Sequence, residues 1–221
     1  MPSPLAPDCY QAGYHGIRHA DLLGNEEYFW ARAETALKYF LPRDLDGRVF
    51  DFGCGVGQSM ALVPDEEGWD ISPEAVGACR RRGLRVYDRL EAVPRGVHET
   101  VLCRHVLEHV EAPLGSLRMI HTLLKPGGVL ILVVPEEPRG PSPLLPDLNQ
   151  HLYCWTFRTI NNLLYRAGYT PVSNAMRYPL GWLAFLPIRR RLGSQVYVRL
   201  TELGRVLRRN GELVVRAVPR A

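Results

Sequence analysis

The sequence lacks the features that mark secreted, disulfide-stapled and membrane-spanning proteins. Its five cysteines are odd in number and form no C-x-x-C pair, which argues against a disulfide framework and against a cysteine zinc site. No apolar run reaches the ~20 residues that cross a bilayer. The first residues hold early prolines in place of a basic-then-apolar leader. We therefore expect a cytoplasmic protein with reduced thiols.

An excess of one charge is also missing. The net charge is +4 over 221 residues, and no long basic run is interleaved with aromatic residues, so no nucleic-acid partner is expected. We identify no metal-ligand spacing in the sequence, so no metal is expected. The length suits one α/β domain, and a hydrophobic fraction of 46% supplies a sizeable core.

The densest motif lies in residues 48–58. A short apolar run there is typical of a buried strand, and Gly53, Gly55 and Gly57 follow it at alternate positions. Alternate glycines let the backbone turn tightly and let a ligand approach it closely. Asp51 precedes them, and a carboxylate at this point disfavours a phosphate and favours a ligand with a positive amine, such as S-adenosylmethionine. A purely structural strand–turn–helix is the alternative.

A second acid follows at the expected end of the next strand. Asp70 lies 70 − 51 = 19 positions after Asp51, so both acids can lie at the same edge of a parallel sheet. We predict that Asp70 accepts hydrogen bonds from the ribose hydroxyls of an adenosine and that Ile71 lies against the adenine. Asp88, at the end of a third expected strand, is a candidate for contact with the adenine amino group. A solvated surface carboxylate is the alternative for Asp70.

Strand and helix patterns alternate along the whole chain. This alternation predicts an α/β fold, a doubly wound Rossmann-like sheet that is mostly parallel, with helices on both faces and ligands at its carboxyl edge. The expected strands cover about 49–52, 67–70, 84–87, 98–103, 129–134, 169–178 and 212–218. The expected helices cover about 25–41, 59–63, 72–82, 114–124 and 156–167, with a further helical stretch between 179 and 209.

Four motifs together resemble class I S-adenosylmethionine-dependent methyltransferases of the single-domain, small-molecule type. The resemblance covers about residues 10–218. Its motifs are residues 49–57, 68–73, 106–110 and 124–130, in that order. The resemblance implies a seven-stranded sheet with an antiparallel last strand. The interval between the first two strands is shorter than in the family, which predicts a stunted first helix.

The resemblance also assigns roles to residues. It implies S-adenosyl-L-methionine as cofactor and methyl donor, with Asp51 and the glycine loop near the methionine part and Asp70 on the ribose. Arg104 and His105, just after the fourth strand, would pass beside the cofactor.

Residues 1–24 are expected to form an N-terminal tail and lid. A methyltransferase domain would then span 25–221, with a helical, apolar-then-basic insertion at about 179–209.

The acceptor side of the site is predicted from loop residues. A hydroxyl acceptor benefits from a base that removes its proton, and His109 and His151 are the candidates, with ordinary packing as the alternative for each. Tyr14, His15 and Tyr153 are candidates for contact with the substrate. The expected acceptor is a small molecule, such as a sugar, a polysaccharide precursor or a secondary metabolite.

Residues 179–191 combine an apolar stretch with Arg189, Arg190 and Arg191. Such a segment can cover the substrate pocket, form a homodimer interface or make a peripheral contact with an anionic membrane. Two other functions remain open for the whole chain. One is an NAD-dependent oxidoreductase on a related sheet, and the other is a non-catalytic binding or scaffold protein that retains the fold.

Overall fold

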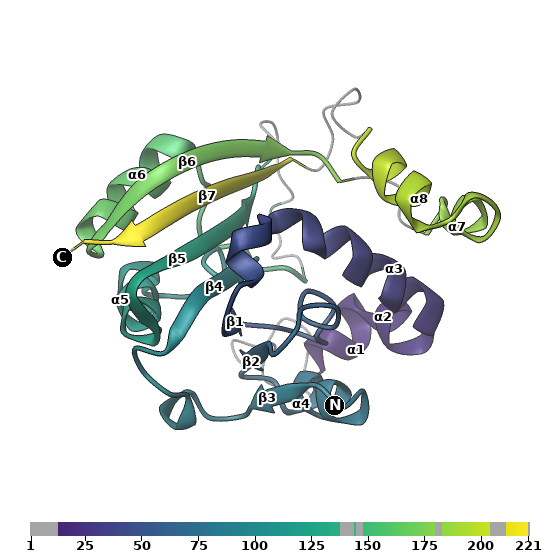
Figure 1. Cartoon of the computed structure of the whole chain (residues 1–221), viewed down its shortest axis with the longest axis horizontal. Coiled ribbons are helices and arrows are strands. Elements are labelled where there is room, and N and C mark those ends of the chain that lie inside the picture. Colours follow the sequence, from purple (N-terminus) through teal and green to yellow (C-terminus); the bar gives the residue numbers. More distant parts are fainter. Residues whose placement is uncertain (1–12, 138–143, 145–147, 180–182, 204–210, 221) are drawn as a thin grey trace.

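A seven-stranded sheet runs through the computed structural model, which describes residues 13–137, 144, 148–179, 183–203 and 211–220 (Figure 1). The spatial order of the strands is β3-β2-β1-β4-β5-β7-β6. β7 is antiparallel to both of its neighbours, whereas the other pairs are parallel. The strands are β1 (Val49–Phe52), β2 (Glu67–Trp69), β3 (Arg85–Tyr87), β4 (His98–Arg104), β5 (Leu124–Pro135), β6 (Tyr169–Arg177) and β7 (Glu212–Pro219).

Helices cover both faces of this sheet, which confirms the predicted Rossmann-like architecture (Figure 1). Since the side chains of a strand alternate between faces, neighbouring core residues belong to different layers. Leu130 and Leu132 pack with α5 and α6, whereas Ile131 packs with the end of α3. The helices are α1 (Tyr14–Arg18), α2 (Ala20–Gly24), α3 (Glu26–Ala36), α4 (Pro73–Arg81), α5 (Pro113–Leu123), α6 (Phe157–Arg166), α7 (Leu186–Leu192) and α8 (Ser194–Thr201).

Three helix starts follow the capping residues expected from the sequence. Asn25 accepts a hydrogen bond from the backbone N–H of Tyr28 at 2.9 Å, and Ser72 accepts one from Ala75 at 3.3 Å. Thr156 caps α6 in the same way. Each cap satisfies a backbone donor that the first turn of the helix leaves unpaired. These caps fix where α3, α4 and α6 begin.

Two local expectations are wrong. Residues 59–63 form turns and no helix, because the short connection between β1 and β2 must turn back within a few residues and ends near Pro64. β5 begins at Leu124, before the expected residue 129, since Leu124 pairs with His98 ahead of a register shift. The Lys125–Gly128 turn is therefore part of an irregular strand.

The helices α7 and α8 pack on α3. Arg189 donates two hydrogen bonds to the Glu34 carboxylate, at 3.0 and 2.6 Å, and Arg190 donates to Glu27 at 2.9 Å. Tyr197 of α8 is fully buried. Two of the three arginines are therefore paired with α3 and do not form an open basic patch.

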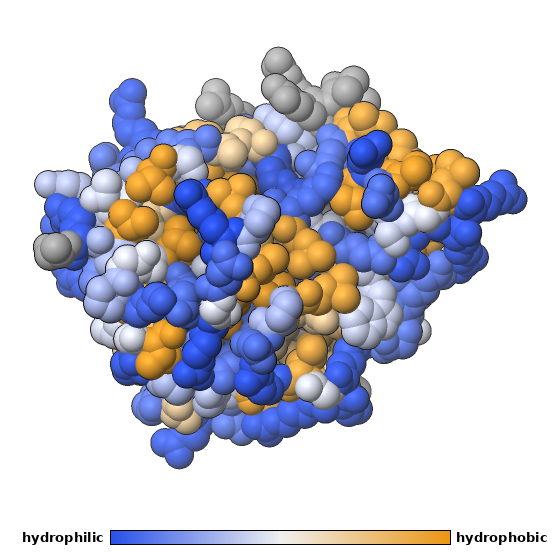
Figure 2. Space-filling view, in the orientation of Figure 1, coloured by the Kyte–Doolittle hydropathy of each residue, from blue (hydrophilic) through white to orange (hydrophobic). Residues whose placement is uncertain are grey.

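Apolar side chains are still exposed near these two helices, at the upper right of Figure 2. They include Leu183 and Leu192, whereas residues 180–182 lie outside the described part of the chain. Most of the proline-rich stretch 135–146 also lies outside it. In the described residues, no helix has the length and apolar character needed to span a membrane.

Candidate functional site

A cavity of about 1150 Å³ opens at the carboxyl edge of the parallel strands. Its walls come from the loops after β1, β2 and β4, from α1 and α2, and from the start of β7. Ligand cavities usually measure roughly 300–1,000 Å³. The space is therefore sufficient for a nucleoside cofactor together with a small second molecule.

The glycine loop after β1 forms one wall. Gly53, Gly55 and Gly57 all have positive φ angles, of 79°, 55° and 89°. Residues with a Cβ rarely adopt such angles. A Cβ on Gly53 would clash with Val106 Cγ2. Gly57 does not line the cavity, and a Cβ there would lie 2.5 Å from Leu84 Cδ1. Gly53 and Gly55 therefore bring backbone to the cavity, while Gly57 permits close packing behind it.

Asp51 reaches the cavity from the middle of the sheet. Its side chain is 1% exposed, and its Oδ1 has no hydrogen-bond partner among the described residues. Burial raises the pKa of Asp51 to about 7, with the Arg104 charge opposing this shift and the Asp70 charge adding to it. A buried carboxylate oxygen without a donor is costly. Asp51 is therefore suited to receive the ammonium group of a ligand.

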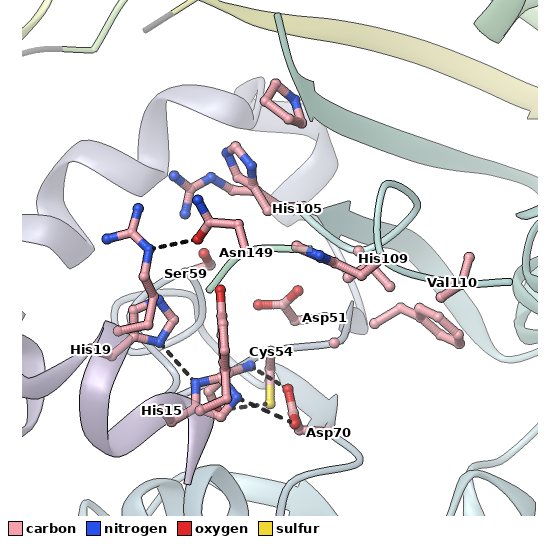
Figure 3. Close-up of a pocket in the computed structure, with 18 of the residues that line it drawn as sticks. His15, His19, Asp51, Cys54, Ser59, Asp70, His105, His109, Val110 and Asn149 are labelled. Atoms are coloured by element: carbon pink, nitrogen blue, oxygen red, sulfur yellow. Dashed lines mark hydrogen bonds and ion pairs between the residues drawn. The ribbon is translucent and has the colours of Figure 1, made fainter. Parts of the chain in front are cut away.

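Asp70 is held at the tip of β2 by the backbone. It accepts hydrogen bonds from the N–H groups of Gly55 at 2.7 Å and Ser72 at 2.8 Å. His15 Nε2 lies 3.8 Å from its Oδ1. Ile71, next to it, is 52% exposed and lines the cavity. Figure 3 shows Asp70 and His15 together at one side of the pocket, with Asp51 nearer its middle.

Charged residues at the end of β4 form a compact network. Arg104 donates to Glu212 at 3.2 Å, and His105 Nε2 lies 2.8 Å from the same carboxylate. The other ring nitrogen of His105 lies 3.2 Å from Glu108 Oε1. Burial alone would raise the pKa of Glu212, but the Arg104 charge and the His105 hydrogen bond hold it well below its usual range. Arg104 and His105 are thus fixed by Glu212 at the cavity wall.

His105 also departs from ordinary strand geometry. Its φ angle is +54°, an uncommon conformation for a residue other than glycine. Burial would lower the pKa of His105, but hydrogen bonds to Glu108 and Glu212 raise it. The turn directs the ring away from the strand and between two carboxylates, which favour its charged form.

His109 and His151, the two predicted candidates for the general base, lie side by side. Their ring centroids are 4.8 Å apart, with an interplanar angle of 70°. Both line the cavity, and His151 Nδ1 is hydrogen-bonded to Glu137. Burial lowers the pKa of His109 to about 4, so its ring is neutral at pH 7. In Figure 3, Asp51 lies between Asp70 and His109, which are at different ends of the pocket.

The N-terminal helices form a further wall. Tyr14 and His15 of α1 line the cavity, and the lid stays a prediction. His15 Nδ1 lies 2.8 Å from His19 Nδ1, and burial lowers the pKa of both, that of His19 to about 3. A Cβ on Gly55 would lie 3.5 Å from the His15 ring. His15 therefore stands directly over the glycine loop.

Two predicted site residues do not line the cavity. Asp88 is paired with Arg80 at 3.0 Å, and its side chain is 58% exposed. Tyr153 donates its hydroxyl hydrogen to the Glu111 carbonyl at 2.8 Å and stacks on Trp155. The structure gives neither residue a place beside a ligand in this cavity.

Other cavity residues were missed by sequence reasoning. Glu212 belongs to β7, a strand that was assigned no role. Because β7 runs antiparallel to β5, it begins at the sheet edge where β5 ends, which is the edge of the cavity. Glu137 belongs to the proline-rich stretch and lines the cavity, whereas Glu108 does not line it and is completely buried beside His105. An acid between two predicted site histidines, His105 and His109, was the available sequence signal for Glu108.

Comparisons with known proteins identify related chains. The family model described as a methyltransferase domain matches residues 24–174. A ubiquinone biosynthesis O-methyltransferase of Xanthomonas oryzae is 38% identical over 128 residues, which cover 51% of this chain and 54% of that protein. The chain thus spans about half the length of the curated relatives that it matches.

Solved structures resemble the whole fold. One is a Burkholderia thailandensis 1,6-didemethyltoxoflavin-N1-methyltransferase with bound 1,6-didemethyltoxoflavin and S-adenosylhomocysteine. It has a TM-score of 0.60 and 20% identity, over 100% of this chain and 94% of that chain. Another is a Haemonchus contortus phosphoethanolamine N-methyltransferase with a TM-score of 0.64 and 17% identity, over 100% of this chain and 61% of that chain.

The chain belongs to the methyltransferase domain family. The predicted resemblance to class I S-adenosylmethionine-dependent methyltransferases is thereby confirmed. The predicted cofactor, S-adenosylmethionine, is confirmed with it.

Proposed function

We propose that the protein transfers a methyl group from S-adenosylmethionine to a hydroxyl group of a small-molecule acceptor. The observation that carries this proposal is the buried Asp51 carboxylate, whose Oδ1 has no partner among the described residues at the edge of the glycine loop. A carboxylate in that position is suited to an ammonium group, and Asp70 lies on the side where a nucleoside sugar would be recognised.

The cofactor end of the cavity is assigned to residues of β1, β2 and their loops. Asp51 would bind the ammonium group, and the backbone of Gly53 and Gly55 would pass beside the methionine part. Asp70 would accept the ribose hydroxyls, and Ile71 would contact the adenine. Arg104 and His105, held by Glu212, would form the opposite wall. Asp88 is left out of this assignment because it is paired with Arg80 on the surface.

The acceptor end is assigned to the His109–His151 pair. The bound cofactor supplies an electrophilic methyl group, so most of the catalysis can come from holding the acceptor oxygen in line with it. His151, oriented by Glu137, and the neutral ring of His109 both face this end and can take the hydroxyl proton. Tyr14 and His15 would close the cavity over the two ligands.

Two observations bear on the chemical class of the acceptor. A relative named as a ubiquinone biosynthesis O-methyltransferase favours an oxygen acceptor, and the cavity volume fits a small molecule beside the cofactor. Sugars, polysaccharide precursors and secondary metabolites are the compounds to test first. The pairing of Arg189 and Arg190 with α3 gives no support to a membrane contact through residues 179–191.

The test combines binding with turnover. Calorimetry with S-adenosylhomocysteine should show one site per chain, and NAD should not bind. A radiolabelled methyl group should then move from S-adenosylmethionine into one member of an acceptor pool. Binding without transfer to any acceptor would favour a non-catalytic protein, and binding of NAD alone would favour an oxidoreductase.

A single variant tests the acceptor end. His151→Ala should lower turnover while leaving the dissociation constant of S-adenosylhomocysteine nearly unchanged, since His151 lies at the end assigned to the acceptor. The matched control is His121→Ala, which changes a histidine of α5 that does not line the cavity. Unchanged turnover in His151→Ala would remove His151 from the reaction.

A further inference from the structure

Glu108, His109 and His151 bring three metal-ligating groups to one point. One ligand atom of each residue lies within 4.8 Å of the other two. The sequence did not predict a metal because His151 lies far along the chain from the adjacent Glu108 and His109, so no ligand spacing is visible. Folding brings them together, since Leu152 donates its backbone N–H to the Glu108 carbonyl at 2.7 Å.

The donor set is that of a divalent transition metal. Two imidazoles and one carboxylate are a recurrent ligand set of catalytic zinc sites, which leave a position open for water or substrate. Imidazole also favours zinc over magnesium or calcium, which prefer oxygen ligands. His109 and His151 line the cavity, so the open position would face the space assigned to the acceptor.

The surroundings of the three residues support ligation. Glu108 is fully buried, and its Oε2 has no hydrogen-bond partner among the described residues. His109 Nε2 lies 3.8 Å from Glu108 Oε1. His151 is hydrogen-bonded through Nδ1 to Glu137, which leaves Nε2 for a metal. A carboxylate that orients a ligating histidine through its other nitrogen is the usual outer partner in such sites.

We propose that Glu108, His109 and His151 bind one divalent zinc-type cation at the acceptor end of the cavity. Zinc bonds of about 2.0–2.1 Å place tetrahedral ligand atoms roughly 3.3 Å apart, so the ligand atoms, now within 4.8 Å of one another, close in by at most about 1.5 Å when the cation binds. This inference extends the proposed function, because a cation that contacts the acceptor hydroxyl lowers its pKa. The two ligated histidines would then hold the cation in place of acting as bases, and the acidified hydroxyl would release its proton to water.

The experiment measures zinc binding and does not depend on turnover. The full chain, freed of metal with a chelator, is titrated calorimetrically with Zn²⁺, and Co²⁺ is used as a probe with a visible absorption spectrum. One ion per chain is expected. His109→Gln and His151→Gln should each weaken binding at least ~100-fold, and Glu137→Gln ~10–100-fold, as for other outer partners of metal ligands.

Matched controls separate this site from adventitious binding. His121→Gln changes a histidine outside the cavity, and Cys154→Ser removes an exposed thiol; neither should change the zinc affinity. Zinc affinity that is unaltered in both His109→Gln and His151→Gln would overturn the proposal, as would the absence of binding at millimolar Zn²⁺.

The same variants are titrated with S-adenosylhomocysteine. A histidine variant that no longer binds zinc but still binds S-adenosylhomocysteine supports the cation site and shows that the fold is intact. Should the wild-type chain bind the nucleoside but no zinc, the cation site fails and the proposed methyl transfer stands. Should it bind zinc but not the nucleoside, the proposed function fails and the cation site stands.

Discussion

Asp51 joins two properties at the residue scale, since it is buried in the sheet and also reaches the cavity. Its pKa of about 7 means that a cationic ligand meets a carboxylate that is only partly ionised near neutral pH. Binding of an ammonium group requires the charged form and would lower this pKa. Ligand binding and ionisation of Asp51 are therefore coupled.

This coupling predicts a pH dependence. From pH 5.5 to pH 7, the affinity for S-adenosylhomocysteine should rise about tenfold, because the ionised fraction of Asp51 rises by about that factor below its pKa. The window lies below the ordinary pKa of an α-amino group, about 7.7–8.0. Calorimetry across this range should show a flatter profile for Asp51→Asn. Equal slopes for the two proteins would contradict the assignment of Asp51.

A second residue-scale prediction compares two acids at strand ends. Asp70→Asn should weaken S-adenosylhomocysteine binding by roughly 10–100-fold, since a hydrogen bond to a charged group contributes about 1.5–3 kcal/mol. Asp88→Asn is the matched control, because Asp88 lies outside the cavity. Both dissociation constants are measured calorimetrically. A loss of affinity in the control alone would exchange the roles of the two residues.

At the element scale, α7 is joined to α3 by the two-pronged Arg189–Glu34 pair, whose side chains are 21% and 20% exposed. Arg189→Ala should lower stability by about 1 kcal/mol, and hence the melting temperature by about 2–4 °C. Calorimetric melting measures the change. Arg191→Ala, at an exposed position of the same helix, should have little effect. Additive losses in a double-mutant cycle with Glu34→Ala would show that the pair contributes nothing.

The predictable elements are those with local signals. Ser72 and Thr156 define helix starts, and the apolar run of β5 defines a central strand, because capping and burial act on neighbouring residues. The glycine loop and Asp70 were predictable for the same reason. Glu212 was not, since its contacts with Arg104 and His105 form only when distant parts of the chain fold together. The contact of His109 with His151 likewise depends on tertiary folding.

At the scale of the whole molecule, a second buried acid affects stability. Glu66 is 5% exposed, and neither of its carboxylate oxygens has a partner among the described residues. Burial, with an added contribution from the Asp51 charge, raises the pKa of Glu66 well above its usual value. The folded chain therefore holds a proton that the unfolded chain releases. The stability that this proton contributes is fully present below the pKa of Glu66 in the unfolded chain. It is lost as the pH rises toward the pKa of Glu66 in the folded chain.

Glu66→Gln tests this dependence. The variant lacks the titration, so its melting temperature relative to the wild type should increase from pH 5 to pH 8. The expected gain is about 1.4 kcal/mol, or roughly 2–4 °C, for each pH unit in which only the folded state is protonated. Asp65→Asn, at an adjacent exposed acid, is the control. A constant difference between variant and wild type over this range would rule out the predicted titration of Glu66.

The insertion of β7 between β5 and β6 has a consequence for biosynthesis. Arg104 and His105 emerge from the ribosome long before Glu212. During that time neither side chain has the Glu212 carboxylate as a partner. Domains generally fold as units during synthesis, so this cavity wall forms only after β7 has been translated. A nascent chain arrested before residue 212 should therefore not retain S-adenosylhomocysteine, even with every residue of the glycine loop already outside the exit tunnel.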